Sequence, residues 1–255
     1  MLRIIDARTG EPVPAAPARR GLTRVEAHTA GYDSTSLRVL LVADVLVRAL
    51  ELGGTPVWAL LNGERDRAEL LAGAAALGIR PFEDGSGGLG SGGLGSGLGS
   101  GLGEAQSLHV LGEEATTSDG LSTGGVRIAV APVESAAAGI PAGADPSAVR
   151  LALLTTRRGA PLRLDADALA EAQDTLRRWR RAVADWARQP SRAIPEEVRG
   201  ELRAAWEDDL DVPGVLRVLR SVETSDLPEG ARFETYAYAD RLLGVELTRD
   251  VGAPA

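Results

Sequence analysis

Residues 22–61 decide the fold, with the sequence LTRVEAHTAGYDSTSLRVLLVADVLVRALELGGTPVWALL. Residues 22–30 are typical of a β-strand, and a short loop follows at residues 31–34. Residues 35–52 are strongly apolar on nearly every side, and their length favours a helix that is buried all round. A pair of glycines then ends the predicted helix.

A second strand and a second helix follow at similar spacing. Residues 55–61 are predicted as a strand, and residues 64–77 as a helix closed by Gly78. This order is typical of a parallel sheet whose strands are joined by crossover helices. Residues 107–111 and 126–131 are predicted to be further strands, so the α/β pattern continues in the second half of the chain.

The segment between these two groups of strands has an unusual composition. Residues 85–103 contain only Gly, Ser and Leu. Such a segment lacks the side chains needed to offset its ordering entropy, so it is predicted to be a flexible coil spanning about 25 Å. It is not a P-loop, because that motif ends in a lysine and the chain contains none.

The pattern becomes helical from residue 145 onward. Asp145 and Pro146 combine a helix N-cap with a proline at the first helical position. Asp165 is predicted to cap a long helix whose apolar face repeats every three or four residues, with Trp179 near its middle. Three more helices complete a predicted C-terminal bundle, near residues 195–209, 212–223 and 230–243.

These patterns divide the chain into six segments. An irregular N-terminal segment is followed by the first half of an α/β domain, a flexible linker, the remainder of that domain, a helical bundle and a tail. The predicted bounds are 1–21, 22–84, 85–103, 104–144, 145–248 and 249–255. The first segment is expected to be irregular because three prolines disfavour a helix there.

Composition excludes several classes of function. The net charge of −8 argues against a free-standing nucleic-acid-binding protein. The chain has no cysteine and only two histidines, so no disulfide and no metal site are predicted. A membrane span needs about 18 apolar residues, and neither such a run nor a signal-peptide pattern is found. A cytoplasmic location is therefore predicted.

Several stretches, in order, resemble the cysteinyl-tRNA synthetases and their relative, the cysteine ligase of mycothiol biosynthesis. Residues 28–37 (HTAGYDSTSL) resemble the first strand of that family and its turn into a helix. Residues 145–154 (DPSAVRLALL) give the strongest match, and residues 205–214 (AWEDDLDVPG) resemble an acidic turn between helices. The resemblance covers most of residues 22–82 and 106–248. It implies a reduced Rossmann-like class I synthetase sheet, followed by a C-terminal α-helical bundle.

The same resemblance shows which catalytic groups are missing. Family members activate an amino acid with ATP, using a His-x-Gly-His signature, a lysine-containing loop and, for cysteine, a zinc ion bound by Cys, Cys, His and Glu. The first signature falls on residues 36–39 (SLRV) or within 33–36, the loop falls near residues 120–125, and the first zinc cysteine falls near Ala27. None of the three sets is present, so whether the chain is an enzyme stays open at this point.

Three hypotheses follow from the resemblance. The leading one is a catalytically degenerate paralogue with a binding or regulatory role, which holds a nucleotide-like or aminoacyl-adenylate-like ligand or pairs with a protein partner. The second is an active ATP-dependent ligase with a remodelled site, and the third is a structural module without a pocket. ATP is implied only by resemblance, zinc is not expected, and tRNA is not expected because no anticodon-binding part is recognised.

The predicted site lies between the first strand and the first helix. Tyr32, Asp33, Thr35 and Ser36 occupy the carboxyl end of a strand, where ligands usually bind in α/β sheets. The competing interpretation is that these polar residues simply cap the helix. A formed cleft here, facing His109, would count against the structural-module hypothesis.

Other polar residues allow two interpretations each. The family position matching His109 contacts adenine or phosphate, whereas a strand histidine more often hydrogen-bonds to backbone. Arg127 is either a replacement cation for phosphate or a solvated strand residue, and His28 is expected to be structural. A run of arginines is predicted to form a solvated helix face rather than a nucleic-acid contact: Arg177, Arg178, Arg180, Arg181, Arg188 and Arg192.

Overall fold

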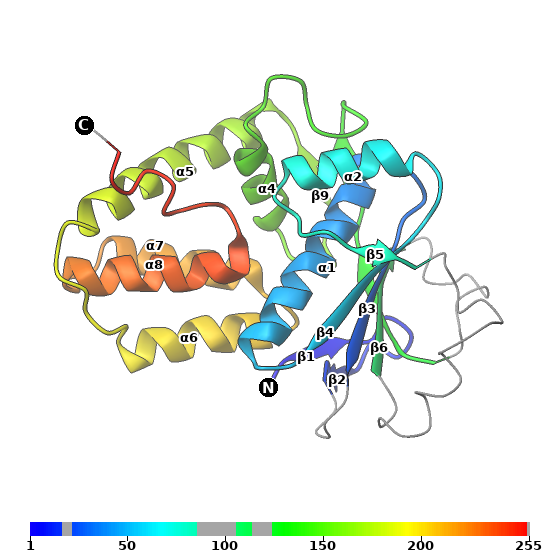
Figure 1. Ribbon diagram of the computed structural model, residues 1–255, viewed down its shortest axis with the longest axis horizontal. Coiled ribbons are helices and arrows are strands. Elements are labelled where there is room, and N and C mark those ends of the chain that lie inside the picture. Colours follow the sequence, from blue (N-terminus) through cyan, green and yellow to red (C-terminus); the bar gives the residue numbers. More distant parts are fainter. Residues whose placement is uncertain (17–21, 86–105, 114–123, 254–255) are drawn as a thin grey trace.

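The computed structural model describes residues 1–16, 22–85, 106–113 and 124–253, so residues 86–103 of the predicted linker lie outside the described part. It shows a parallel sheet beside a group of helices (Figure 1), which confirms the predicted α/β class. The central sheet has five strands, all parallel, in the order β5-β4-β3-β6-β7. The strands are β3 (Thr23–His28), β4 (Val57–Asn62), β5 (Glu83–Asp84), β6 (Gln106–Gly112) and β7 (Val126–Val130).

The crossover helix α1 (Ser34–Leu52) connects β3 to β4 and lies between the sheet and the other helices (Figure 1). Most of its residues are buried, which confirms the prediction from its apolar pattern. Helix α2 (Arg67–Ala76) follows β4 and is the second predicted helix. The right-handed twist of strands and the short connections make this strand–helix alternation the usual route to a parallel sheet.

The helical bundle is formed by α4 (Pro146–Leu154), α5 (Ala166–Trp186), α6 (Glu196–Glu207), α7 (Val212–Glu223) and α8 (Glu229–Leu243). The predicted caps are confirmed, because the Asp145 carboxylate accepts from the Ser147 N–H and the Asp165 carboxylate accepts from the Ala168 N–H. Trp179 is fully buried, and its ring meets that of Tyr236 edge-on at 5.7 Å.

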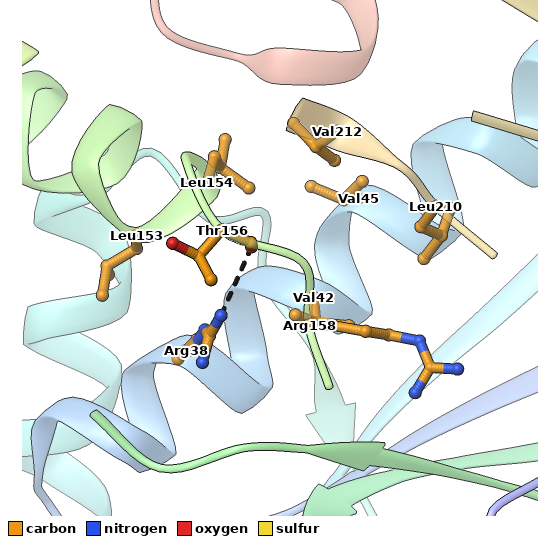
Figure 2. A pocket seen from close by; sticks show the side chains of 9 residues that line it. All are labelled: Arg38, Val42, Val45, Leu153, Leu154, Thr156, Arg158, Leu210 and Val212. Atoms are coloured by element: carbon orange, nitrogen blue, oxygen red, sulfur yellow. Dashed lines mark hydrogen bonds between the residues drawn. The ribbon is translucent and has the colours of Figure 1, made fainter. Parts of the chain in front are cut away.

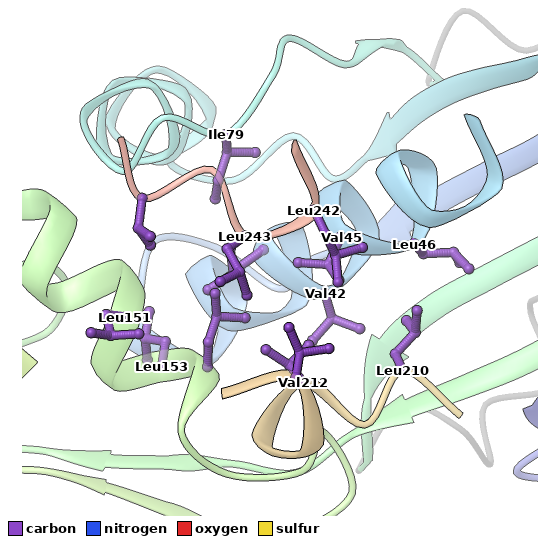
Figure 3. Packing of buried hydrophobic residues seen from close by; sticks show 14 of the residues in the cluster. Val42, Val45, Leu46, Ile79, Leu151, Leu153, Leu210, Val212, Leu242 and Leu243 are labelled. Carbon is purple, nitrogen blue, oxygen red and sulfur yellow. The ribbon is translucent and has the colours of Figure 1, made fainter. Parts of the chain in front are cut away.

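The hydrophobic core is continuous from the sheet into the bundle. Figure 3 shows Val42 and Val45 of α1 among Val212 of α7 and Leu242 and Leu243 of α8. Helix α1 therefore contributes to both parts of the core, which explains why nearly all its faces are apolar. The domain boundary at residue 145 stays a prediction, since the packing does not mark it.

A buried ion-pair network adds a polar link between the same elements. Arg150 and Asp44 are each about 1% exposed and are joined by a 2.7 Å contact between Arg150 Nη2 and Asp44 Oδ2. Arg150 also donates to the carbonyl oxygens of Leu77 and Leu243. Burial alone would raise the pKa of Asp44, but the charges of Arg150 and Arg48 hold that pKa below its ordinary value.

The N-terminal segment differs from the sequence prediction. Strands β1 (Arg3–Ile5) and β2 (Pro12–Pro14) form an antiparallel hairpin, so the expectation of an irregular segment is wrong for these residues. Prolines exclude a helix but are tolerated in a two-stranded edge, and Ile4 is completely buried. Strands β8 (Val133–Ser135) and β9 (Leu162–Leu164) were also not predicted, because three residues are too few to show a periodic pattern.

The predicted arginine run is exposed except at Arg180, but Arg188 and Arg192 follow the end of α5 and are not part of a helix face. Arg180 is only 6% exposed and donates to the carbonyl oxygens of Val245 and Glu246. The solvated-face interpretation is therefore wrong for Arg180, which binds the chain after α8. Within the described residues, no helix combines the length and the hydropathy needed to cross a bilayer.

Candidate functional site

A cleft of about 470 Å³ opens at the carboxyl ends of β3, β6 and β7, beside the N-terminus of α1. Its lining residues are His28, Thr29, Ala30, Asp33, Thr35, Ser36, Val39, Gly112, Glu113, Val130 and Pro132. This is the place where open α/β sheets usually bind ligands. A cleft is therefore formed at the predicted place, although His109 does not line it.

A larger hollow of about 690 Å³ lies elsewhere, between residues 134–137 and 163–169. It is more open to solvent and is formed by β8, β9 and the start of α5 rather than by the central sheet. The larger volume of this hollow therefore comes from a shallow depression that is open to solvent. The cleft at the strand ends is the better candidate site.

The polar residues at the start of α1 are engaged in holding the helix. The Asp33 carboxylate accepts from the Ser36 N–H at 2.6 Å, and the Thr35 hydroxyl accepts from the Val133 N–H at 3.0 Å. The capping interpretation is therefore confirmed for Asp33. A carboxylate already occupies the place where a helix N-terminus would otherwise attract a phosphate.

The electrostatic character of the cleft is acidic. Among the described residues, those that line it include the carboxylates of Asp33 and Glu113 and no arginine. Residues 114–123, which follow Glu113 in the chain, have the sequence EATTSDGLST and add two acidic residues but no basic one. Among the described residues that line the cleft, no arginine is therefore available to neutralise a phosphate chain.

Three of the predicted site residues do not line the cleft. The Tyr32 hydroxyl lies 3.5 Å from the backbone nitrogen of Ile140, and its ring packs so closely on Gly73 that a Cβ there would meet it at 2.9 Å. Arg127 lies in the first half of β7, and its backbone N–H donates to Asp6. His109 is buried behind His28, which itself reaches the cleft.

The position where the His-x-Gly-His signature would fall holds a buried arginine. Arg38 is 1% exposed, and its guanidinium donates to the carbonyl oxygens of Ala131, Thr156, Arg157 and Ala160. Figure 2 shows the Arg38 side chain directed towards the backbone at Thr156. Arg38 and Thr156 both line a cavity of about 20 Å³. Burial lowers the pKa of Arg38 to about 10. This cation holds a loop and does not line the cleft.

The two histidines of the chain are neighbours in space. Glu26 pairs with His109 in the register of β3 and β6, and His28 Nε2 lies 3.1 Å from His109 Nδ1. Burial is the main cause that lowers the pKa of His28 to about 4, with His109 adding to the shift and Glu26 opposing it. Burial also lowers the pKa of His109.

Sequence analysis did not identify Glu26 as a site residue, although a signal was present. Arg24, Glu26 and His28 alternate with buried residues along β3, which places all three on one face of the strand. The 81 residues between His28 and His109 concealed their pairing, because only the strand order β3-β6 brings them together.

These features define a class of protein: a Rossmann-like parallel α/β sheet with a cleft at its carboxyl edge, packed through its crossover helix on a helical bundle. No family model matches the chain. Curated relatives do match, and they are cysteine ligases of mycothiol biosynthesis, each described as L-cysteine:1D-myo-inositol 2-amino-2-deoxy-alpha-D-glucopyranoside ligase.

The protein of Streptosporangium roseum is 41% identical over 109 residues, which is 41% of this chain and 26% of the relative. The proteins of Acidothermus cellulolyticus and Streptomyces griseus are 39% and 38% identical over 107 and 111 residues. The alignments therefore span about a quarter of the length of these relatives. The resemblance predicted from the sequence is confirmed over this part of the chain, which is similar to these cysteine ligases.

Proposed function

We propose that this protein is a catalytically degenerate relative of the cysteine ligases, which binds a small molecule in the cleft at the carboxyl edge of the sheet. Its role is one of binding or regulation in the cytoplasm, alone or with a protein partner such as an intact ligase. The observation that carries the proposal is the acidic lining of a formed cleft, with Asp33 and Glu113 and no basic side chain among its described residues.

Adenylation of an amino acid requires positive charge on the departing pyrophosphate and donors at the α-phosphate. The family supplies these groups as lysines and histidines. This chain has no lysine, and the arginine nearest the lost signature, Arg38, is bound to four carbonyl oxygens. Loss of one preorganised donor lowers a rate by about 100- to 1000-fold, so loss of several supports a binding role over catalysis.

The charges of the cleft favour the amino group of an aminoacyl-adenylate-like ligand over its phosphate. A nucleotide or aminoacyl-adenylate carries phosphate oxygens, which the Asp33 carboxylate at the helix start would repel. An ammonium group would be attracted by Asp33 and Glu113, and apolar groups would contact Val39 and Val130. The proposed ligand is therefore a small molecule bound mainly through an amino group and an apolar part. A tRNA partner is not expected.

The test combines activity with binding. Pyrophosphate exchange with cysteine, ATP and Mg²⁺ should show no turnover above background. A cysteinyl-adenylate analogue that keeps the ammonium group but has an uncharged linker in place of the phosphate should bind in calorimetry. Ala30→Trp, at the exposed rim of the cleft, should weaken that binding at least 10-fold, whereas Ala166→Trp, in the larger hollow, should not.

Three results would contradict the proposal. Clear turnover would favour the remodelled ligase, in which case Arg127→Ala should abolish activity. Absence of both turnover and binding would favour the structural module. Equal effects of the two tryptophan substitutions would show that the analogue does not bind in the cleft.

A further inference from the structure

We propose that Glu26, His28 and His109 form a binding site for a divalent transition-metal ion, with zinc as the best match. The three ligand atoms are Glu26 Oε2, His28 Nε2 and His109 Nδ1, and all lie within 4.8 Å of one another. Two imidazole nitrogens and one carboxylate oxygen form a donor set that zinc binds in proteins. The inference rests on this cluster and does not depend on the ligand of the cleft.

The separations between the three atoms suit a metal at their centre. The two nitrogens are 3.1 Å apart, and Glu26 Oε2 lies 3.7 Å from His109 Nδ1 and 4.0 Å from His28 Nε2. Three atoms so arranged have a common centre about 2.1 Å from each, which is the length of a zinc–nitrogen or zinc–carboxylate bond. Binding would therefore require little movement of the side chains.

Neighbouring groups already orient the ligands. His109 Nε2 lies 3.2 Å from the carbonyl oxygen of Gly124, which can only accept, so the ring proton is on Nε2 and the Nδ1 lone pair points into the cluster. Arg24 binds the other carboxylate oxygen of Glu26 at 2.9 Å, and the Asn62 side-chain amide donates to Oε2 at 3.2 Å. Such outer partners are typical of protein metal sites, because they hold tautomer and ring orientation.

The competing arrangement is a hydrogen bond from His28 Nε2–H to His109 Nδ1. It satisfies the two nitrogens with one proton, but it leaves Glu26 Oε2 facing the acceptor His109 Nδ1 at 3.7 Å. A metal ion would satisfy all three lone pairs at once. Burial lowers the pKa values of both histidines, so both rings are neutral and able to bind a metal at neutral pH.

The cluster is distinct from the zinc site that the resemblance implies. That site uses cysteines, of which this chain has none, and its first position falls near Ala27. Ala27 is buried on the opposite face of β3 from Glu26 and His28. Because three protein ligands leave at least one coordination position free, and because His28 also lines the cleft, the metal would lie at the cleft wall.

The experiment uses the full chain without a histidine tag, treated with chelator and titrated with Zn²⁺ alone in calorimetry and with Co²⁺ alone in visible spectroscopy. We expect one ion per chain and a cobalt spectrum with nitrogen ligands. Because the chain has only two histidines, both imidazole signals should shift in NMR spectra. His28→Asn should weaken zinc binding on the order of 100-fold, and Glu26→Gln at least about 10-fold.

Two controls keep the result interpretable. His28 and Glu26 are partly exposed, so their variants are expected to fold, which circular dichroism and thermal unfolding will check. Glu83→Gln changes an exposed acid on β5, which is separated from the cluster's strands by β4, and should leave zinc binding unchanged. Failure to bind one equivalent of zinc at millimolar concentration would overturn the proposal, as would binding that neither His28→Asn nor Glu26→Gln weakens. Binding of the adenylate analogue is measured separately, so the two proposals fail independently.

Discussion

Two polar clusters in this protein, one around Asp44 and one around Glu26, are built differently. In the cluster around Asp44, the carboxylate meets Arg48, Arg80 and Arg150, and Arg150 also binds two carbonyl oxygens. In the cluster around Glu26, a carboxylate oxygen and two imidazole nitrogens converge with one proton between them. The first contains donors for its acceptors. In the second, Arg24 and Asn62 donate to Glu26, but only one proton lies between the three converging atoms.

The difference separates a structural network from a candidate binding site. Removal of a partner from a satisfied buried ion pair leaves an uncompensated charge, which strongly destabilises the fold. A cluster whose converging atoms share one proton gains stability only when another proton or a cation enters it. The Asp44 cluster is therefore expected to govern folding, and the Glu26 cluster is expected to respond to its ligand and to pH.

The largest effect is expected from Asp44→Ala. It leaves Arg150, which is 1% exposed, without its charged partner, and the free energy of unfolding should fall by about 3–5 kcal/mol. Urea unfolding measures this change. Asp174→Ala, which removes an exposed ion pair with Arg177, should alter the same quantity by less than about 0.5 kcal/mol. Equal effects of the two substitutions would show that the Asp44 cluster contributes no more to stability than an exposed ion pair.

A smaller effect is expected from pH in the metal-free protein. Because the pKa of His28 is about 4 in the folded protein and 6.5 for an ordinary histidine, the unfolded chain binds more protons between these values. Stability is therefore full above pH 6.5 and is lost as pH falls towards 4, by about 2 kcal/mol between pH 7 and 5. Urea unfolding with chelator present measures the slope.

His28→Asn should reduce this pH dependence. Burial also lowers the pKa of His109, so His109 accounts for the slope that remains in the variant. A variant with the same slope as the parent protein would show that His28 does not cause it, and that the Glu26 cluster does not respond to pH as proposed.

Loss of the Asp33 cap should have a still smaller effect. Asp33→Ala removes the acceptor of the Ser36 N–H, and the free energy of unfolding should fall by about 1 kcal/mol. The same substitution removes one carboxylate from the cleft, so binding of anions there should become tighter. Asp33→Asn keeps the cap and removes the charge, so it should alter anion binding with little loss of stability. Thermal unfolding and calorimetry measure the two effects.

The smallest effect is expected from Glu26→Gln in metal-free protein. The amide keeps the shape of the side chain. The Glu26 cluster connects only adjacent strands, which the backbone hydrogen bonds of the sheet already hold together. The free energy of unfolding should change by less than about 1 kcal/mol. A loss as large as that of Asp44→Ala would mean that both clusters are structural, and thermal unfolding at pH 7 decides between these outcomes.

The main helices and four of the five central strands, β3, β4, β6 and β7, could be predicted from the sequence because their signals are local. Helix α1 was visible as a long apolar run, and α4 and α5 were marked by Asp145 and Asp165 as caps. The candidate site was predicted only in part. Asp33, Thr35 and Ser36 line the cleft, but Tyr32 and Arg127 lie outside it, since their side-chain directions depend on packing against segments distant in the chain.

The amino-acid sequence by itself determined the α/β class and the absence of lysine and cysteine. These properties depend on composition and on patterns a few residues long. Only the tertiary structure decided that Arg38 binds a loop, that the cleft is acidic, and that Glu26 and His28 meet His109. The physical reason is that strand order and register place residues 81 positions apart within hydrogen-bond distance, and no local pattern encodes that pairing.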